Sequence, residues 1–181
     1  MNDLGSFRKA KDEYFAGDPQ SPLTTPQRRA FVGLVYFPEN AELRLEVLAV
    51  RGESNEPLEI QTSTGEIQTY SRLGRFQFTV DGRPAELTIF QGENGPFLPF
   101  VDSLAGTETY PAGRYLEPDP LPGGRFLVDF NYAYNPYCAY NPQWSCPLTP
   151  FENRLKVPIR AGEKLFEQSH ESMPGEGSSD G

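Results

Sequence analysis

The dipeptide Asp81-Gly82, near the middle of the chain, restricts the fold more than any other short stretch. Asp-Gly is a favoured pair for the two-residue type I′ turn of a β-hairpin, because both turn residues must adopt positive φ. Counting outward from this turn leaves one face of the hairpin largely apolar and the other polar, as a half-buried sheet requires. The predicted strand pairs are Val80–Arg83, Phe78–Ala85, Gln77–Glu86, Phe76–Leu87 and Arg75–Thr88.

Turn-forming residues extend the β prediction to the rest of the chain. The 18 prolines and 17 glycines favour many short strands over a helical bundle. Ser63-Thr64-Gly65 predicts a second hairpin between Leu58–Thr62 and Glu66–Tyr70. We therefore expect a mainly β fold, an antiparallel meander closing into a barrel or a curled sheet, with a sandwich as the alternative.

The first 30 residues differ, because their apolar residues recur at helical spacing. Residues 3–15 predict an amphipathic helix whose charged residues, Lys11 among them, remain in solvent. Thr25 and Pro26 are the expected N-cap and first residue of a brief second helix. We expect both helices to flank or plug the sheet, which gives a single β-rich domain over residues 1–168, with residues 1–30 as its helical flank. Residues 169–181 are expected to be a disordered tail.

The densest run of aromatic residues lies between Phe130 and Trp144, interleaved with Asn, Pro and both cysteines. This run is too irregular for a helix and too rich in proline for a central strand. Each ring buries roughly 150–250 Å², so we expect residues 130–163 to form an ordered proline- and aromatic-rich C-terminal cap. A Tyr-Asn-Pro turn occurs twice in it, at Tyr134 and at Tyr140. These turns either present rings and amides to a ligand or fill the mouth of the barrel.

Charged residues are predicted to meet beside this cap. If residues 113–117 and 125–130 pair as a hairpin, Arg114 lies opposite Asp129. Together with Glu152 and Arg154, these charges either line a pocket or hold the cap in place as an ion-pair network. A buried carboxylate, Asp129 or Glu152, could also act as an acid or base. The candidate ligand-binding residues are Arg114, Asp129, Asn131, Tyr134, Asn135, Tyr137, Tyr140, Glu152 and Arg154.

Several classes of site are excluded by what the sequence lacks. The single histidine, His170, lies in the expected tail, so neither a histidine-dependent nucleophile nor a His-rich metal site is expected. A glycine-rich phosphate loop does not occur, and we expect neither metal nor cofactor. The net charge of −9 argues against nucleic acid and anionic membranes as partners. Without a membrane-spanning run or signal peptide, the expected location is the cytoplasm.

The two cysteines, Cys138 and Cys146, are separated by seven residues, unlike the spacing of zinc knuckles. In the cytoplasm we expect both thiols to be reduced and buried. A disulfide, a redox role or a metal role is the alternative interpretation.

Four stretches carry a resemblance to a known family. They are TSTGE at residues 62–66, ETYPAGRYL at 108–116, the segment from DFN at 129–131 to CPL at 146–148, and ENRLKVPIRAGE at 152–163. Over residues 7–163 the chain resembles a family of bacterial and archaeal proteins designated a domain of unknown function. The resemblance implies no activity, because the family has no established reaction.

Three hypotheses for function follow from the residues. The first is a β-barrel that binds a small molecule in a pocket beneath the cap. The second is an enzyme, a hydrolase or isomerase, that uses carboxylate, Arg and Tyr groups without histidine. The third is a non-catalytic interaction domain whose cap presents an exposed aromatic surface to a partner.

Overall fold

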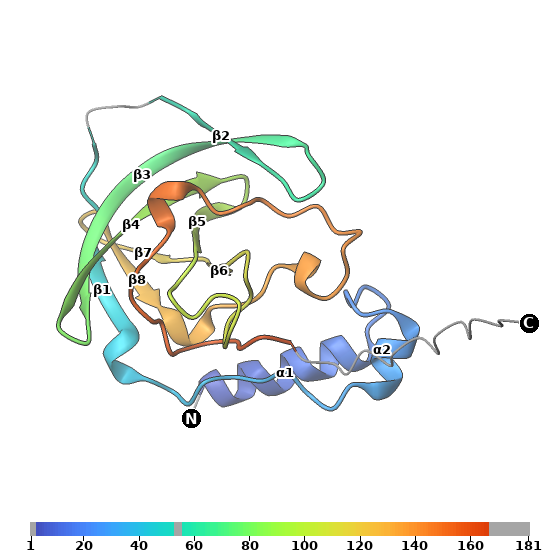
Figure 1. The fold of residues 1–181 in the computed structure, drawn as a ribbon. Coiled ribbons are helices and arrows are strands. Elements are labelled where there is room, and N and C mark those ends of the chain that lie inside the picture. The colour runs from blue at the N-terminus through green and yellow to red at the C-terminus, as the bar shows by residue number, and fades with distance from the viewer. Residues whose placement is uncertain (1–2, 53–55, 167–181) are drawn as a thin grey trace, which may run out of the picture.

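Two antiparallel sheets and two N-terminal helices make up the computed structural model, which describes residues 3–52 and 56–166 (Figure 1). The larger sheet curls into a half-barrel, so the prediction of a mainly β, antiparallel, curled fold is confirmed. Its strands, in spatial order, are β2 (Leu58–Gln61), β3 (Ile67–Val80), β4 (Arg83–Gly92), β5 (Gly95–Phe100) and β6 (Arg114–Leu116). The smaller sheet has the order β1 (Arg44–Leu48), β8 (Arg125–Asp129) and β7 (Asp119–Leu121).

The hairpin centred on Asp81-Gly82 forms as predicted, with all five residue pairs in the expected register. Asp81 has φ 50° and Gly82 has φ 75°, the positive values that a type I′ turn needs. The predicted hairpin around residues 63–65 is also confirmed, because β2 pairs with β3. These turns are local, so the residues that define them stand next to each other in the sequence.

The predicted pairing of Arg114 with Asp129 is wrong. Arg114 begins β6 and lies opposite Phe100 of β5, whereas Asp129 ends β8 and lies opposite Arg44 of β1. The hairpin partner of β8 is instead β7, which lies between the two segments that were predicted to pair. Proline is tolerated there because β7 is the edge strand of its sheet.

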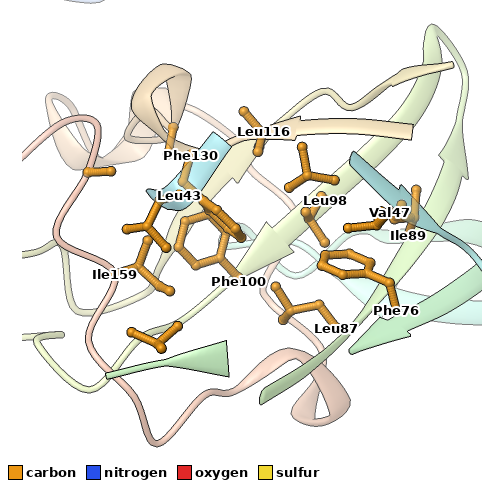
Figure 2. Packing of buried hydrophobic residues seen from close by; sticks show 14 of the residues in the cluster. Leu43, Val47, Phe76, Leu87, Ile89, Leu98, Phe100, Leu116, Phe130 and Ile159 are labelled. Atoms are coloured by element: carbon orange, nitrogen blue, oxygen red, sulfur yellow. The ribbon is translucent and has the colours of Figure 1, made fainter. Parts of the chain in front are cut away.

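A single hydrophobic core cluster joins the two sheets to the C-terminal segment (Figure 2). Phe100 and Phe130 pack edge to face at its centre, with ring centroids 5.3 Å apart. Leu87, Ile89 and Val128 are fully buried around them. Because side chains fill this space, the curve of the sheet encloses a packed interior.

The N-terminal helices, α1 (Asp3–Gly17) and α2 (Thr25–Ala30), form close to the predicted positions. The N-cap of α2 is Thr24, one residue before the prediction, and it forms a capping box with Gln27. Figure 1 shows α1 lying along the C-terminal segment, at the same end of the molecule as α2. Among the described residues, none of the helices is long and apolar enough to cross a bilayer. The expected tail and His170 lie outside the described residues.

The expected cap follows β8 as an ordered chain without long regular elements. It contains three short 3-10 helices, Phe130–Tyr132, Tyr137–Ala139 and Phe151–Asn153. Backbone bridges tie it to the sheets, among them Tyr134 to Tyr115 of β6 and Pro147 to Thr62 beside β2. These bridges therefore hold the cap in a fixed position beside strand β6.

Candidate functional site

A cavity of about 750 Å³ lies between α1, the β6–β8 region and the cap. Aromatic rings form the largest group of its lining side chains, and the polar groups are few. A second cavity of about 600 Å³ shares Tyr115, Glu117 and Tyr134 with it. The larger cavity is lined by Phe7, Lys11, Tyr14, Phe15, Tyr115, Leu116, Glu117, Asp119, Leu127, Asp129, Tyr132, Tyr134, Pro136, Tyr137, Trp144, Ser145 and Cys146.

Simple periodicity explains how strand β8 and helix α1 supply cavity walls. Successive residues of a strand point to opposite faces, so Val128 enters the core while Leu127 and Asp129 line the cavity. On α1, Phe7, Lys11 and Phe15 are four residues apart and therefore share one face. The backbone geometry of α1 and β8 therefore directs these side chains toward the cavity.

Lys11 lies inside this wall rather than in solvent, which corrects the prediction for its helix. Its Nζ is 3.2 Å from a side-chain oxygen of Glu163 and 4.9 Å from the ring centroid of Tyr134. Glu163 is fully buried and also accepts hydrogen bonds from the Asn135 backbone N–H (2.7 Å) and the Tyr140 hydroxyl (3.0 Å). The charge of Lys11 is therefore already compensated within the protein. Its spacing between Phe7 and Phe15 was the sequence signal that could have revealed this position.

Glu117, which directly follows β6, is the carboxylate that lines both cavities. It accepts a hydrogen bond from the Tyr134 hydroxyl. Burial is the main influence on the pKa of Glu117, and it raises that pKa above the ordinary value. Burial and the neighbouring Glu117 carboxylate likewise raise the pKa of Tyr134, so its hydroxyl remains a donor. Glu117 is not among the predicted site residues, because nothing in the local sequence marks it.

Asp129 lines the cavity, but its own charge is partly neutralised. Arg44 approaches one carboxylate oxygen at 3.5 Å, and the other oxygen accepts from the backbone N–H of Asn131 (3.0 Å). Asn131 is buried and exchanges hydrogen bonds with the backbone of Asn40. Asp129 therefore also has a structural role besides its place on the cavity wall. It is the N-cap residue of the 3-10 helix Phe130–Tyr132, with which the C-terminal cap begins.

Arg114 is a buried structural residue with 1% exposure, and it does not line the cavity. Its guanidinium donates to the backbone carbonyls of Ile159, Ala161 and Glu163 and lies 3.7 Å from Asp102. Burial lowers the pKa of Arg114 to about 10, against the opposing charges of Asp102 and Glu163. Arg114 therefore holds the C-terminal segment to the start of β6.

Glu152 and Arg154 lie away from the cavity, on the other side of the cap. Glu152 is hydrogen-bonded by Arg72 at 2.8 Å and by the hydroxyl of Thr88 at 2.7 Å. Burial opposes the ionisation of Glu152, but these hydrogen bonds outweigh it and lower the pKa of the carboxyl. Arg154 is exposed. The charges named in the sequence analysis therefore occupy separate places.

Of the nine predicted ligand-binding residues, the structure brings Asp129, Tyr134 and Tyr137 together around the cavity. Asn135 and Tyr140 are buried beside Glu163 and help to hold the cap in place. Within residues 3–52 and 56–166, no group of three or more His, Cys, Asp or Glu side chains is placed to hold a metal ion. The cavity-lining residues that were not predicted come from α1, from the region of β6–β8 and from other parts of the cap.

Comparison with known proteins places this architecture in a family. The family described as "Protein of unknown function (DUF1684)" matches residues 29–164. The fold is similar to the solution NMR structure of an uncharacterized protein from gene locus rrnAC0354 of Haloarcula marismortui, with 36% sequence identity and a TM-score of 0.66. The similarity covers 89% of this chain and 91% of that one. A search among curated proteins finds no match. The chain therefore belongs to the DUF1684 family of proteins of unknown function.

Proposed function

We propose that this protein binds a small organic cation, with an aromatic or aliphatic body, in the cavity between α1, β6–β8 and the cap. The observation that carries the proposal is the combination of aromatic walls with carboxylates in one cavity. Aromatic rings attract a cation through their negative faces, and their area also buries an apolar body. A volume of about 750 Å³ falls in the range of small-molecule sites.

The charged side chains that line the cavity favour a positively charged ligand. Lys11 is neutralised by Glu163, and Asp129 is partly neutralised by Arg44. In the described part of the chain, neither Glu117 nor Asp119 forms an ion pair. A cationic group near Glu117 would compensate this charge, whereas an anionic ligand would add to it.

The single tryptophan of the chain, Trp144, lines the cavity and can report binding by its fluorescence. We expect benzyltrimethylammonium to change this fluorescence saturably, and phenylacetate, of similar size and opposite charge, to bind at least about tenfold more weakly. Glu117→Gln should weaken binding of the cation by about 2- to 30-fold, the effect of about 0.5–2 kcal/mol for a cation near aromatic rings and a carboxylate.

The control variant is Glu59→Gln, which removes an exposed carboxylate on β2 that lines neither cavity. It should bind the cation as the unmodified protein does. Equal affinity for the two probes, or no loss in Glu117→Gln, would contradict a site selective for cations.

Two other hypotheses receive less support from the site. Acid–base catalysis would need a free carboxylate, yet Asp129 and Glu152 are both ion-paired, which leaves Glu117 and Asp119 of the cavity lining as candidates. The rings from Phe130 to Trp144 are buried or half-buried, so they form no exposed aromatic surface for a protein partner. A cytoplasmic location and the absence of nucleic-acid partners remain part of the proposal, on the grounds of composition and charge.

A further inference from the structure

The two cysteines of the chain meet at the edge of the cap. Cys138 lies in the 3-10 helix Tyr137–Ala139, and its backbone N–H points at the Sγ of Cys146, with an N···S distance of 3.4 Å. The hydroxyl of Tyr110 lies 3.8 Å from the Sγ of Cys138. Two free thiols are therefore held side by side by contacts from the cap and from the loop before β6.

The surroundings give these thiols different properties. Cys138 is half-buried, whereas Cys146 is buried and forms part of the cavity wall. The hydrogen bond from the Cys146 thiol is the main cause that lowers the pKa of Cys138 to about 6, against the effect of burial. The same hydrogen bond raises the pKa of Cys146. Cys138 is thus the thiol that ionises first and the more accessible of the two.

Tyr110 can stabilise the thiolate of Cys138 without losing its own proton. Burial, with the nearby Cys138, raises the pKa of Tyr110 to about 12, so its hydroxyl remains a donor at neutral pH. A thiolate that faces a phenol and lies next to a buried second thiol is the arrangement of an attacking and a resolving cysteine.

We propose that Cys138 and Cys146 form a thiol–disulfide exchange site for small organic disulfides, with Cys138 as the nucleophile and Cys146 as the resolving thiol. The Cys138 thiolate attacks one sulfur of the disulfide RSSR, so a Cys138–SR bond forms and RS⁻ leaves and is protonated. Cys146 then loses its proton and attacks the Sγ of Cys138, which releases the second RS⁻. In total, two protein thiols are oxidised to one disulfide, and RSSR is reduced to two RSH.

The cavity gives this exchange a structural consequence. Cys146 lies in the same wall as Trp144 and Tyr137, so a bond from Cys146 to Cys138 changes the position of a lining side chain. The exchange itself requires no ligand in the cavity. The two proposals can therefore fail independently of each other.

The first test is a redox titration of the full chain with mixtures of reduced and oxidised glutathione, followed by intact mass spectrometry. We expect the unmodified protein to lose two hydrogens and form an internal disulfide. Cys146→Ala should stop at a stable adduct of glutathione on Cys138, because the resolving thiol is missing. Cys138→Ala should react at least about tenfold more slowly, because the thiol that remains is buried and ionises at higher pH.

The second test measures the rate of alkylation of Cys138 by iodoacetamide as a function of pH. The rate in the unmodified protein should follow an apparent pKa of about 6, and this value should rise in Cys146→Ala and in Tyr110→Phe. A protein that stays reduced at every glutathione ratio would overturn the proposal without recourse to any variant. An adduct that accumulates equally in the unmodified protein and in Cys146→Ala would overturn it as well.

Discussion

Arg114 was a predicted ligand-binding residue, yet its role in the structure is to hold the C-terminal segment in place. An arginine beside aromatic residues suggested a ligand contact, but its guanidinium donors are used by carbonyls of the C-terminal segment. Lys11 is the opposite case, a charged helical residue that lies in the cavity wall. Residue type alone does not separate these cases, because the distinction depends on which distant backbone or carboxylate lies within reach. The buried partners Asp102 and Glu163 carry no local sequence signal of that role.

We predict that Arg114→Met lowers the free energy of unfolding by about 3–5 kcal/mol, since it leaves Asp102 buried without its cation and several carbonyls without a donor. Chemical denaturation followed by circular dichroism measures this difference. Arg154→Met removes an exposed arginine and should change stability by no more than about 0.5 kcal/mol. A loss below about 1 kcal/mol in Arg114→Met would contradict the structural role assigned to this residue.

At the scale of elements, turns were predictable and long-range pairing was not. The hairpin at Asp81-Gly82 was correct in every pair, because turn chemistry and alternation in neighbouring residues define it. Strand β6 pairs with β5, and β8 pairs with β1 and β7, which no local pattern could indicate. Only Asp129, Tyr134 and Tyr137 of the predicted site residues line the cavity, because that cavity also needs α1, whose approach to the cap depends on tertiary contacts.

Gly162 offers a test of how tightly the C-terminal segment fits against the cap. Its φ is +77°, and a Cβ atom there would lie 2.6 Å from the backbone oxygen of Ala133. Gly123, with φ +78°, has no neighbouring atom within 4 Å of the same position. Both substitutions to Ala incur the left-handed backbone cost, about 1–2 kcal/mol. Gly162→Ala should therefore cost about 1–3 kcal/mol more than Gly123→Ala in denaturant unfolding, and equal losses would contradict the close packing.

At the scale of the whole molecule, segments distant in sequence share one core. Val128 of β8 and Phe130 at the start of the cap lie in the same cluster as Leu43, Leu87 and Leu98. The bridge between Val50 and Arg75 also joins the segment after β1 to the bulged middle of β3. These contacts favour a single cooperative unit in unfolding.

We predict that thermal unfolding followed by Trp144 fluorescence, which reports the cap, coincides with unfolding followed by far-ultraviolet circular dichroism, which reports the sheets. The midpoints should agree within about 1 °C, because a two-state transition has the same midpoint for every probe. A cap that loses its fluorescence signal at a clearly lower temperature than the sheets would show that it unfolds as a separate unit.

The position of α1 has a consequence for how such a cavity can diverge. The helix supplies Phe7, Lys11, Tyr14 and Phe15 to the cavity, yet it precedes the region that matches the family, residues 29–164. The residues that build the sheets and the Arg114 network lie within that matched region. Phe7 and Tyr14 belong neither to the sheets nor to the Arg114 network, so substitutions there change the cavity wall and leave those parts of the fold in place. Proteins that share the matched region can thus differ in this wall while keeping the same sheets.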